Sequence, residues 1–438
     1  MNIDKKFNDF LSDCKRLIAI PSINAPAEDG MPFGEAINDA LVEMIDIASE
    51  MGYRTFIDPE GYYGYAEIGE GELFGVLCHL DVVPAGDLNN WHFDPFEMTI
   101  KDNKIYGRGI QDDKGPTLLS MYALKLLLDE GMELKKRVRF IFGTDEEVLM
   151  RCIEQYKQKE EIPKMGFTPD SIFPVTNAEK GLYQLDIFTE ENIDFTFHGG
   201  EACNSVASMA YIDFDEKIEA ALKAKDRDYE MFSGQLKVIG KSVHVKDATD
   251  GDNAIIALAN ILKELDYKSS LLDFIVEKCG DANGELLFGK VEDDISGKLM
   301  FNVGIAEFSK VGQRICIDMR IPVTYSREAL DKVLNEAKDK YNLTSKEVDY
   351  VKPLYIPEDS LLVQSLMEAY QEVTGDYTAK PLASGGATFS RCIDNFVAFG
   401  ADLPTSKTTA HQADECVDTG DYKKAMEVYI KAFELLVF

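Results

Sequence analysis

Positive charge is scarce in this chain of 438 residues, in which 46 lysines and arginines stand against 78 aspartates and glutamates and give a formal net charge of −32. A surface field of that sign repels phosphate backbones and anionic headgroups. Apolar residues make up 45% of the chain, but no apolar run reaches the roughly 18–20 residues that cross a bilayer. We therefore expect neither nucleic acid nor a membrane as a partner.

The eight cysteines are widely spaced, and none forms a CxxC pair. A disulfide framework or a thiolate zinc site is therefore not expected. The first 22 residues lack the apolar core and cleavage site of a signal peptide. They predict an amphipathic helix with Phe7, Phe10, Leu11 and Cys14 on one face. Together these features predict reduced thiols and a cytoplasmic protein.

Two short apolar runs flank a helical pattern in the first part of the chain. Runs 73–78 and 138–142 are typical of parallel strands that are covered on both faces. Residues 114–132 between them predict a helix that ends near Gly131. A strand, a helix and a strand in this order predict a right-handed crossover within a mostly parallel sheet.

The pattern changes at about residue 183, where shorter strand candidates such as 181–190, 230–241 and 314–323 are mixed with helices. After about residue 355, a helix, a strand and a closing helix restore the first pattern. The fold class predicted is therefore α/β. A mostly parallel-sheet domain, formed by residues 1–182 and 356–438, contains an inserted α+β module, residues 183–355.

Histidines number only five, and two stand in settings typical of metal ligands. His79 follows the run 73–78, and Asp81 comes two residues later, so both point to one face of an extended segment. Such an Asp can accept from the imidazole N–H and fix its tautomer. The alternative for this pair alone is an ordinary turn after a core strand. His92 and His198 have no ligand-like neighbours, which favours a surface or structural role.

Two pairs of adjacent carboxylates accompany these strands. Asp112 and Asp113 stand in a loop before a helix, where a carboxylate can bridge two cations or, as Asp113 suggests, cap the helix. Glu146 and Glu147 follow the second apolar run, and neighbouring carboxylates are driven apart in pKa by repulsion and metal binding. Glu147 would then bind a metal while Glu146 transfers a proton. The alternative is a solvated acidic turn.

Seven segments, in order over essentially the whole chain, resemble the zinc-dependent exopeptidases that include aminoacylase, carnosinase and carboxypeptidase G. These segments are CHLDVVPAGDLNNWHFDPF, YGRGIQDDKGP, GTDEE, FTPDSIFP, NAEKG, GKSVH and AHQADE. Within that group, MPFG, DDKGP and TPDSIFP make the chain most similar to PepV-type dipeptidases. The resemblance implies that the larger domain is catalytic and that the inserted module is a lid.

The resemblance also implies two divalent cations. The implied ligands are His79, Asp112 and Asp170 for one cation and Asp112, Glu147 and His411 for the other. Asp112 would bridge the cations, Asp81 would support His79, and Glu146 would be the general base. Imidazoles with carboxylates suit Zn²⁺ first, with Mn²⁺ or Co²⁺ as alternatives.

In the lid, the resemblance implies that His244 stabilises the oxyanion and that Arg320 binds the substrate carboxylate. Further substrate contacts are implied for Asn204, Ser384, Gly385 and Gly386. Lid closure would bring His244 and Arg320 to the metals. The long lid favours a monomer.

The implied activity is hydrolysis of dipeptides with a free carboxylate. An N-acyl amino acid deacylase would use the same metals and base, and a catalytically silent relative would act as a binding protein. The intact ligand set argues against the silent relative. The chain departs from the family after Glu147, where a small polar residue and glycine are usual and Val148, Leu149 and Met150 stand instead.

Overall fold

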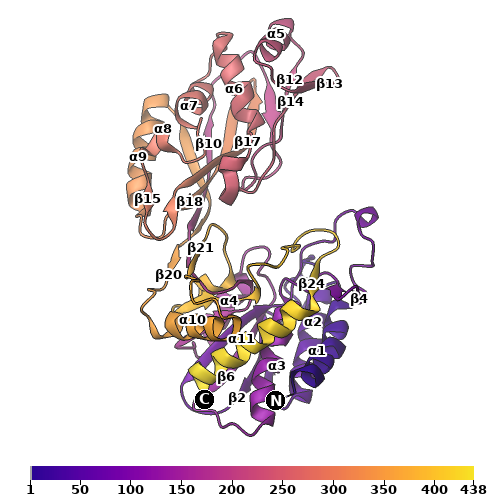
Figure 1. Ribbon diagram of the computed structural model, residues 1–438. Helices are drawn as coiled ribbons and strands as arrows, with labels where there is room; N and C mark the ends of the chain where they lie inside the picture. The colour runs from indigo at the N-terminus through magenta and orange to yellow at the C-terminus, as the bar shows by residue number, and fades with distance from the viewer. Residues whose placement is uncertain (1) are drawn as a thin grey trace. The chain divides into compact units, whose positions relative to one another are not determined.

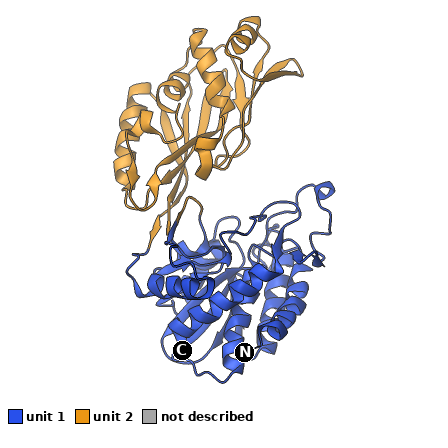
Figure 2. Ribbon diagram, viewed as in Figure 1, with its two compact units in different colours: residues 1–177, 356–382, 387–438 blue, residues 178–355, 383–386 orange. Residues whose placement is uncertain are grey.

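The computed structural model describes residues 2–438 and divides the chain into two compact units (Figure 2). Unit 1 comprises the residues up to 177 together with 356–382 and 387–438, and unit 2 comprises residues 178–355 and 383–386. The sequence pattern places the first change at residue 183. In unit 2, Ala178 and Glu179 pair with Tyr355 and Leu354, and β10 (Gly181–Thr189) pairs with another strand of that unit from its first residue.

Unit 1 is built around a mixed sheet, and its main helices are labelled in Figure 1. The strands, in spatial order, are β1 (Arg54–Ile57), β2 (Tyr63–Ile68), β6 (Arg137–Gly143), β3 (Leu73–His79), β7 (Met165–Thr168) and β22 (Phe396–Ala398). The last four run parallel to one another, and β2 runs antiparallel to both of its neighbours, β1 and β6. The main helices are α1 (Ile3–Ile18), α2 (Glu35–Glu50), α3 (Lys114–Asp129), α4 (Arg151–Lys159), α10 (Leu361–Thr374) and α11 (Thr419–Val437).

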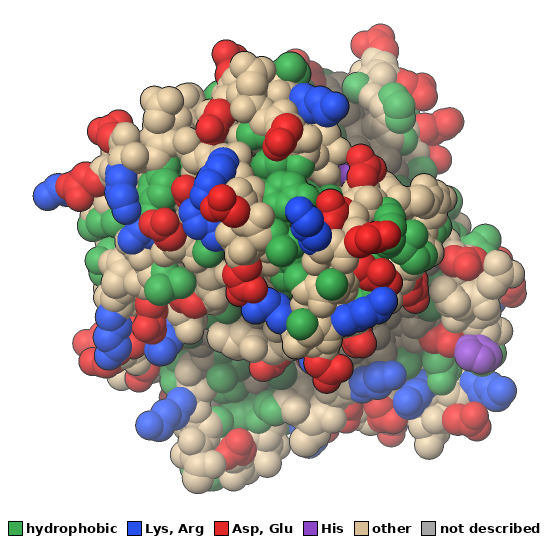
Figure 3. All heavy atoms as spheres, turned by 90° about the horizontal axis from the view of Figure 1, so that it is seen from above, with side chains coloured by type: hydrophobic (Ala, Val, Ile, Leu, Met, Phe, Trp, Pro, Cys, Tyr) green, Lys and Arg blue, Asp and Glu red, His purple; other side chains and the backbone are tan. Residues whose placement is uncertain are grey.

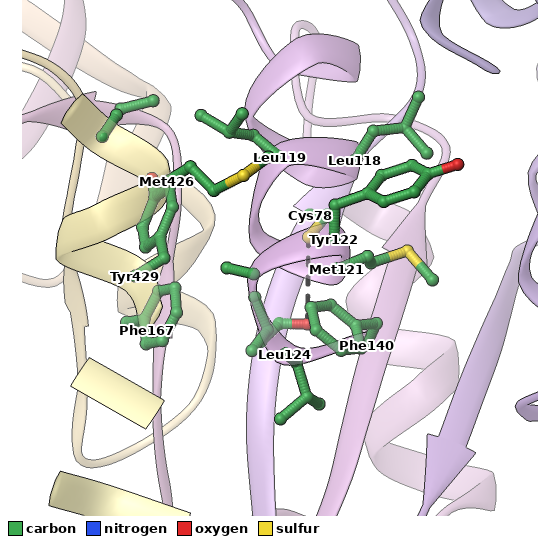
Figure 4. Packing of buried hydrophobic residues seen from close by; sticks show 14 of the residues in the cluster. Cys78, Leu118, Leu119, Met121, Tyr122, Leu124, Phe140, Phe167, Met426 and Tyr429 are labelled. Atoms are coloured by element: carbon green, nitrogen blue, oxygen red, sulfur yellow. Dashed lines mark hydrogen bonds between the residues drawn. The ribbon is translucent and has the colours of Figure 1, made fainter. Parts of the chain in front are cut away.

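Both faces of this sheet are buried, which explains the uninterrupted apolar runs. Phe74, Val76 and Cys78 of β3 belong to the large core formed with α1, α3 and α11. Leu77, on the opposite face, belongs to a second cluster that includes Tyr156 of α4. Figure 4 shows side chains of α3 and α11 packed against the strands in the large core. The predicted strand–helix–strand order is confirmed, since β3 and β6 are parallel neighbours joined through α3.

Smaller strands of unit 1 hold the loops around the sheet. They are β4 (Thr99–Lys101), β5 (Lys104–Tyr106) and β24 (Cys416–Asp418) in one antiparallel group, and β8 (Ser171–Ile172) with β23 (Ala401–Asp402) in a parallel pair. The chain leaves unit 1 within β9 (Thr176–Glu179) and returns after β20 (Leu354–Tyr355).

Unit 2 contains a separate antiparallel sheet. Its strands, in spatial order, are β13 (Tyr229–Phe232), β14 (Gln235–Ile239), β12 (Met209–Asp213), β11 (Phe197–Gly199), β17 (Met300–Ser309), β18 (Gly312–Ile321), β10 and β19 (Thr344–Val351). Its helices are α5 (Glu216–Ala224), α6 (Ala254–Glu264), α7 (Ser270–Lys278), α8 (Glu285–Phe288) and α9 (Arg327–Tyr341), with the 3₁₀ segment η2 (Val245–Asp250). The predicted class, a mostly parallel α/β sheet domain with an α+β insertion, is confirmed.

The prediction of one strand over 230–241 is wrong. This segment folds as the hairpin β13–β14, and Ser233 and Gly234 turn the chain with φ of 50° and 85°. Two successive positive φ angles are those of a type I′ turn, in which glycine is favoured. The pair Ser233-Gly234 was therefore the feature of the sequence that could have predicted this turn.

The prediction of eight reduced thiols is also wrong, because Cys203 and Cys316 form a disulfide. Cys316 lies in β18, and the loop that carries Cys203 is folded onto that strand from 113 positions away in the sequence, so spacing along the chain could not reveal the pair. Disulfides are uncommon in cytosolic proteins. The cysteine pattern therefore no longer supports a cytoplasmic location.

Protein purified without reductant and then denatured is expected to show six reactive thiols, and eight after reduction. Quantitation with a chromogenic thiol reagent measures this difference. In the control Cys203→Ser, seven thiols are expected with and without reductant, because Cys316 has lost its partner. Eight thiols in the unreduced natural protein would contradict the disulfide.

The surface is charged, and among residues 2–438 no helix has the length and apolar character needed to cross a bilayer. Figure 3 shows acidic side chains spread over the displayed face and interspersed with lysines and arginines. On that face the negative charge is therefore distributed and does not form one block.

Candidate metal centre

The candidate site lies in unit 1, beyond the carboxyl ends of three neighbouring parallel strands. His79 is the last residue of β3, Glu146 and Glu147 follow β6, and Asp170 follows β7. Asp112 stands in the loop that leads into α3. Parallel strands deliver their carboxyl ends to one edge of a sheet, which is where ligands collect in α/β folds.

The His79 imidazole is fully buried and held in one orientation. Its Nδ1 lies 3.0 Å from the backbone oxygen of Asp81, and a carbonyl oxygen can only accept, so Nδ1 must donate. Its Nε2 lies 2.9 Å from Oδ1 of Asp112 and 3.7 Å from Oδ2 of Asp170. Asp113, at the N-cap position of α3 without a side-chain cap bond, instead accepts from the His79 backbone N–H at 3.1 Å.

The Asp81 carboxylate contacts the glutamate turn as well as the imidazole. Its Oδ1 lies 3.6 Å from Nδ1 of His79, whereas its two oxygens accept from the backbone N–H groups of Glu146 at 3.1 Å and Glu147 at 3.0 Å. The backbone of Asp81 thus orients the imidazole, and its side chain fixes the turn that carries the two glutamates.

Asp112 lies between two imidazoles. Its Oδ1 faces His79, and its Oδ2 lies 3.0 Å from Nε2 of His411. Oδ1 of Asp112 and Nε2 of His79 are both buried without a hydrogen-bond partner, although they lie 2.9 Å apart. Two buried polar atoms that approach without bonding are poorly satisfied on their own, and a cation that both contact would satisfy them.

Two groups of three residues bring metal-type donor atoms within 4.8 Å of one another. One group is His79, Glu146 and Asp170, and the other is Asp112, Glu147 and His411. Nε2 of His411 also lies 3.2 Å from Oε2 of Glu147. In residues 2–438 no further such group is found. Imidazole nitrogens with carboxylate oxygens are donors that suit Zn²⁺, Mn²⁺ and Co²⁺, so the residues present fit a pair of divalent cations.

Crowded charges shift the pKa values of the site. Burial, with added repulsion from neighbouring carboxylates, raises the pKa of Glu146 well above its usual value. Burial would also raise the pKa of Asp112, but its contacts with His411 and His79 outweigh burial and lower it. The contact with Asp112, and then that with Glu147, raises the pKa of His411 to about 11. Without metal, His411 therefore holds a proton that a cation must displace.

The other two histidines noted in the sequence lie outside these groups. His92 is exposed, and its Nδ1 is hydrogen-bonded to Oδ2 of Asp414 at 2.5 Å. The ring of His198 stacks on Tyr211 with 5.0 Å between the centroids. Both observations agree with the surface or structural role predicted for them.

In unit 2, the predicted substrate residues lie on segments that contact one another. The backbone N–H of Val245 donates to the backbone oxygen of Asn204 at 2.9 Å, which ties the His244 segment to the loop of Asn204. Nη1 of Arg320 donates to the Gly385 oxygen at 3.5 Å. Beside Gly385, the amide of Gly386 donates to Oγ of Ser384 at 2.9 Å.

Asp318 is a partner of Arg320 that the sequence analysis missed. Its two oxygens accept from Nε and Nη2 of Arg320 at 2.8 and 3.0 Å, and one also accepts from Gln184. Residues two apart on a strand share a face, so the spacing of Asp318 and Arg320 was the available signal. The guanidinium is thereby held in one orientation with Nη1 turned to the Gly385 loop.

A mixed α/β sheet that gathers imidazoles and carboxylates at its carboxyl edge is an arrangement typical of metal-dependent hydrolases. A family model described as Peptidase family M20/M25/M40 matches residues 75–435, and the chain belongs to this family of metallopeptidases.

Curated relatives match nearly the whole chain. The Bacillus subtilis protein named "Putative dipeptidase YtjP" is 33% identical over 460 residues, which cover 99% of this chain and 98% of the relative. The Staphylococcus saprophyticus protein named "Putative dipeptidase SSP1012" is 34% identical over 464 residues, which cover 98% and 97%.

Solved structures share the fold. Human carnosine dipeptidase 1 aligns with a TM-score of 0.60 at 16% identity, over 99% of this chain and 97% of that one. The M20 family metallo-carboxypeptidase Sso-CP2 of Sulfolobus solfataricus aligns with a TM-score of 0.60 at 18% identity, over 97% and 98%. At such identities the likeness shows the arrangement of the fold alone.

Proposed function

We propose that this protein is a dipeptidase that hydrolyses dipeptides with a free carboxylate. The observation that supports it most is the Asp112 carboxylate, which lies 2.9 Å from the His79 imidazole with one oxygen and 3.0 Å from the His411 imidazole with the other. A dinuclear hydrolytic site needs such a bridging carboxylate. The names of the full-length relatives point to dipeptides as the substrate class.

His79, Asp112 and Asp170 would hold one cation, and Asp112, Glu147 and His411 the other. Zn²⁺ suits these donors best, with Mn²⁺ and Co²⁺ as alternatives. When bound, such a pair lowers the pKa of a water molecule and polarises a carbonyl oxygen. The negative charge of the site would be offset at the same time.

Glu146 is proposed as the general base. It would accept a proton from the attacking water and return it to the leaving amine. The raised pKa of Glu146 suits a group that must hold the proton between these two transfers. Asp81 supports this role because it fixes the turn of the two glutamates through their backbone N–H groups.

In unit 2, we assign oxyanion stabilisation to His244 and binding of the substrate carboxylate to Arg320. The planar guanidinium can bind a carboxylate with two parallel hydrogen bonds, and Asp318 holds it in a fixed orientation. Asn204 and the loop Ser384–Gly386 would contact the substrate. We also propose that the chain acts as a monomer, which light scattering in solution would test.

A panel of substrates tests the proposal. Metal-stripped protein, with Zn²⁺ or Mn²⁺ added back, is incubated with unblocked dipeptides, a β-alanyl dipeptide, a tripeptide and N-acetyl amino acids. We expect metal-dependent cleavage of dipeptides, measured by amine release, and little cleavage of the acetylated compounds. Asp58→Asn is a suitable control, because this buried carboxylate bonds Lys159 and takes no part in the site.

The other outcomes identify the alternatives. Cleavage of only the acetylated compounds would make the protein an N-acyl amino acid deacylase. Tight binding of metal without turnover of any compound would favour a binding protein. It would also direct attention to Val148 and Leu149, which are exposed next to Glu147.

A further inference from the structure

His411 lacks the packing that fixes His79. The His411 side chain is 53% exposed, whereas that of His79 is 0% exposed. The His411 backbone adopts φ of +63°, a left-handed conformation that costs free energy in a non-glycine residue and persists only where the surroundings enforce it. Apart from the contacts of Nε2 with Asp112 and Glu147, the position of this imidazole depends on the contacts that hold its loop.

Glu415, four residues after His411, is fully buried and bonded to the loop of Asp112. Its Oε1 accepts from the backbone N–H of Gly109 at 3.0 Å, of Gln111 at 2.8 Å and of Asp112 at 3.3 Å. Its Oε2 accepts from the Arg108 guanidinium at 2.6 Å. One side chain thus fixes the turn from which Asp112 projects.

Gln111, next to Asp112, binds in turn to the loop that carries His411. Its Oε1 accepts from the backbone N–H of Thr409 at 2.6 Å and from the Thr409 hydroxyl at 3.0 Å. Its Nε2 donates to Asp402 at 2.7 Å and to the backbone oxygen of Lys407 at 3.2 Å. Thr409 stands two residues before His411, so this loop is tied to the Asp112 loop on both sides of the imidazole.

We propose that Glu415 and Gln111 are positioning residues that hold His411 against Asp112 and so set the affinity of one cation, the one bound by Asp112, Glu147 and His411. This inference rests on the proposed function, because it takes these three residues as ligands. The pair does not contact the His79 imidazole, which burial and the Asp81 backbone oxygen hold in place. Loss of either positioning residue should weaken the cation of His411 more than the other, because His411 serves one cation whereas Asp112 serves both.

The test measures both affinities separately. Metal-stripped full-length protein is titrated with Zn²⁺ in competition with a chromogenic chelator, for the natural protein, Glu415→Gln and Gln111→Met. His411→Ala and Asp170→Ala identify which affinity belongs to which group. The matched control is Glu67→Gln, which also disrupts a buried Glu–Arg pair, with Arg139, but in β2. Circular dichroism checks that each variant is folded.

His411→Ala shows which of the two affinities belongs to the cation of His411. We expect each positioning variant to weaken that affinity by about 10–100-fold, the range for partners that orient metal ligands. The other affinity should fall clearly less, and both affinities of Glu67→Gln should match those of the natural protein. If Glu415→Gln does not fold, Gln111→Met alone decides.

Unchanged affinities in the folded positioning variants, or an equal loss of both, would overturn this inference and leave the proposed function intact. Fewer than two Zn²⁺ on the natural protein, or no effect of His411→Ala, would overturn the assignment of the ligands themselves, and the inference with it.

Discussion

Asp112→Ala is expected to lose both cations and, with them, turnover. The two oxygens of Asp112 face different imidazoles, at 2.9 Å from His79 and 3.0 Å from His411, so one substitution removes a donor from each group. Residues that only orient ligands contribute about 10–100-fold to affinity or activity. The loss of a shared ligand should therefore lower the affinity for each cation by more than about 100-fold.

Metal content after dialysis against micromolar Zn²⁺ and thermal unfolding with and without Zn²⁺ measure the effect. A ligand at 100 times its Kd stabilises a folded protein by about 2.7 kcal/mol, so Zn²⁺ should raise the melting temperature of the natural protein and hardly that of Asp112→Ala. The control Asp58→Ala, which removes another buried carboxylate, should keep the response to Zn²⁺. Two tightly bound ions on Asp112→Ala would contradict the bridging role.

The edge of the sheet at which the candidate residues meet was predictable from sequence, and the reason is topological. The apolar runs that end at His79 and before Glu146 form the neighbouring parallel strands β3 and β6, and parallel strands must present their carboxyl ends together. Alternation along an extended segment likewise placed Asp81 near His79. Both inferences depend on how apolar and polar residues alternate over a few neighbouring positions, and this alternation can be read directly from the sequence.

Contacts between loops distant in sequence were not predictable in this way. The hydrogen bonds of Glu415 to the backbone of Gly109, Gln111 and Asp112 join positions about 300 residues apart. The spacing of residues along the sequence does not predict such contacts. The same holds for the disulfide between Cys203 and Cys316. Which atom of Asp81 meets the imidazole depends on the path of the backbone after β3, because the side chain is drawn to the N–H groups of the glutamate turn.

Glu146→Gln is expected to lower kcat by about 10²–10⁴-fold, the usual contribution of general acid–base catalysis. The amide keeps the size of the side chain but cannot accept a proton. KM should change little, because Glu146 is assigned to proton transfer and not to substrate binding. Steady-state kinetics on the best dipeptide of the panel, with Zn²⁺ content measured on the same samples, gives both quantities.

The metal content decides between two roles for Glu146. A donor atom of Glu146 lies within 4.8 Å of those of His79 and Asp170, so the geometry alone would also allow it to be a ligand. A general base predicts two Zn²⁺ on the inactive Glu146→Gln, whereas a ligand predicts the loss of one. The matched variant Glu147→Gln should lose one Zn²⁺, the one assigned to Asp112, Glu147 and His411, because Oε2 of Glu147 lies 3.2 Å from His411. If both variants lose a cation, the two adjacent glutamates are ligands, and the base must be sought elsewhere.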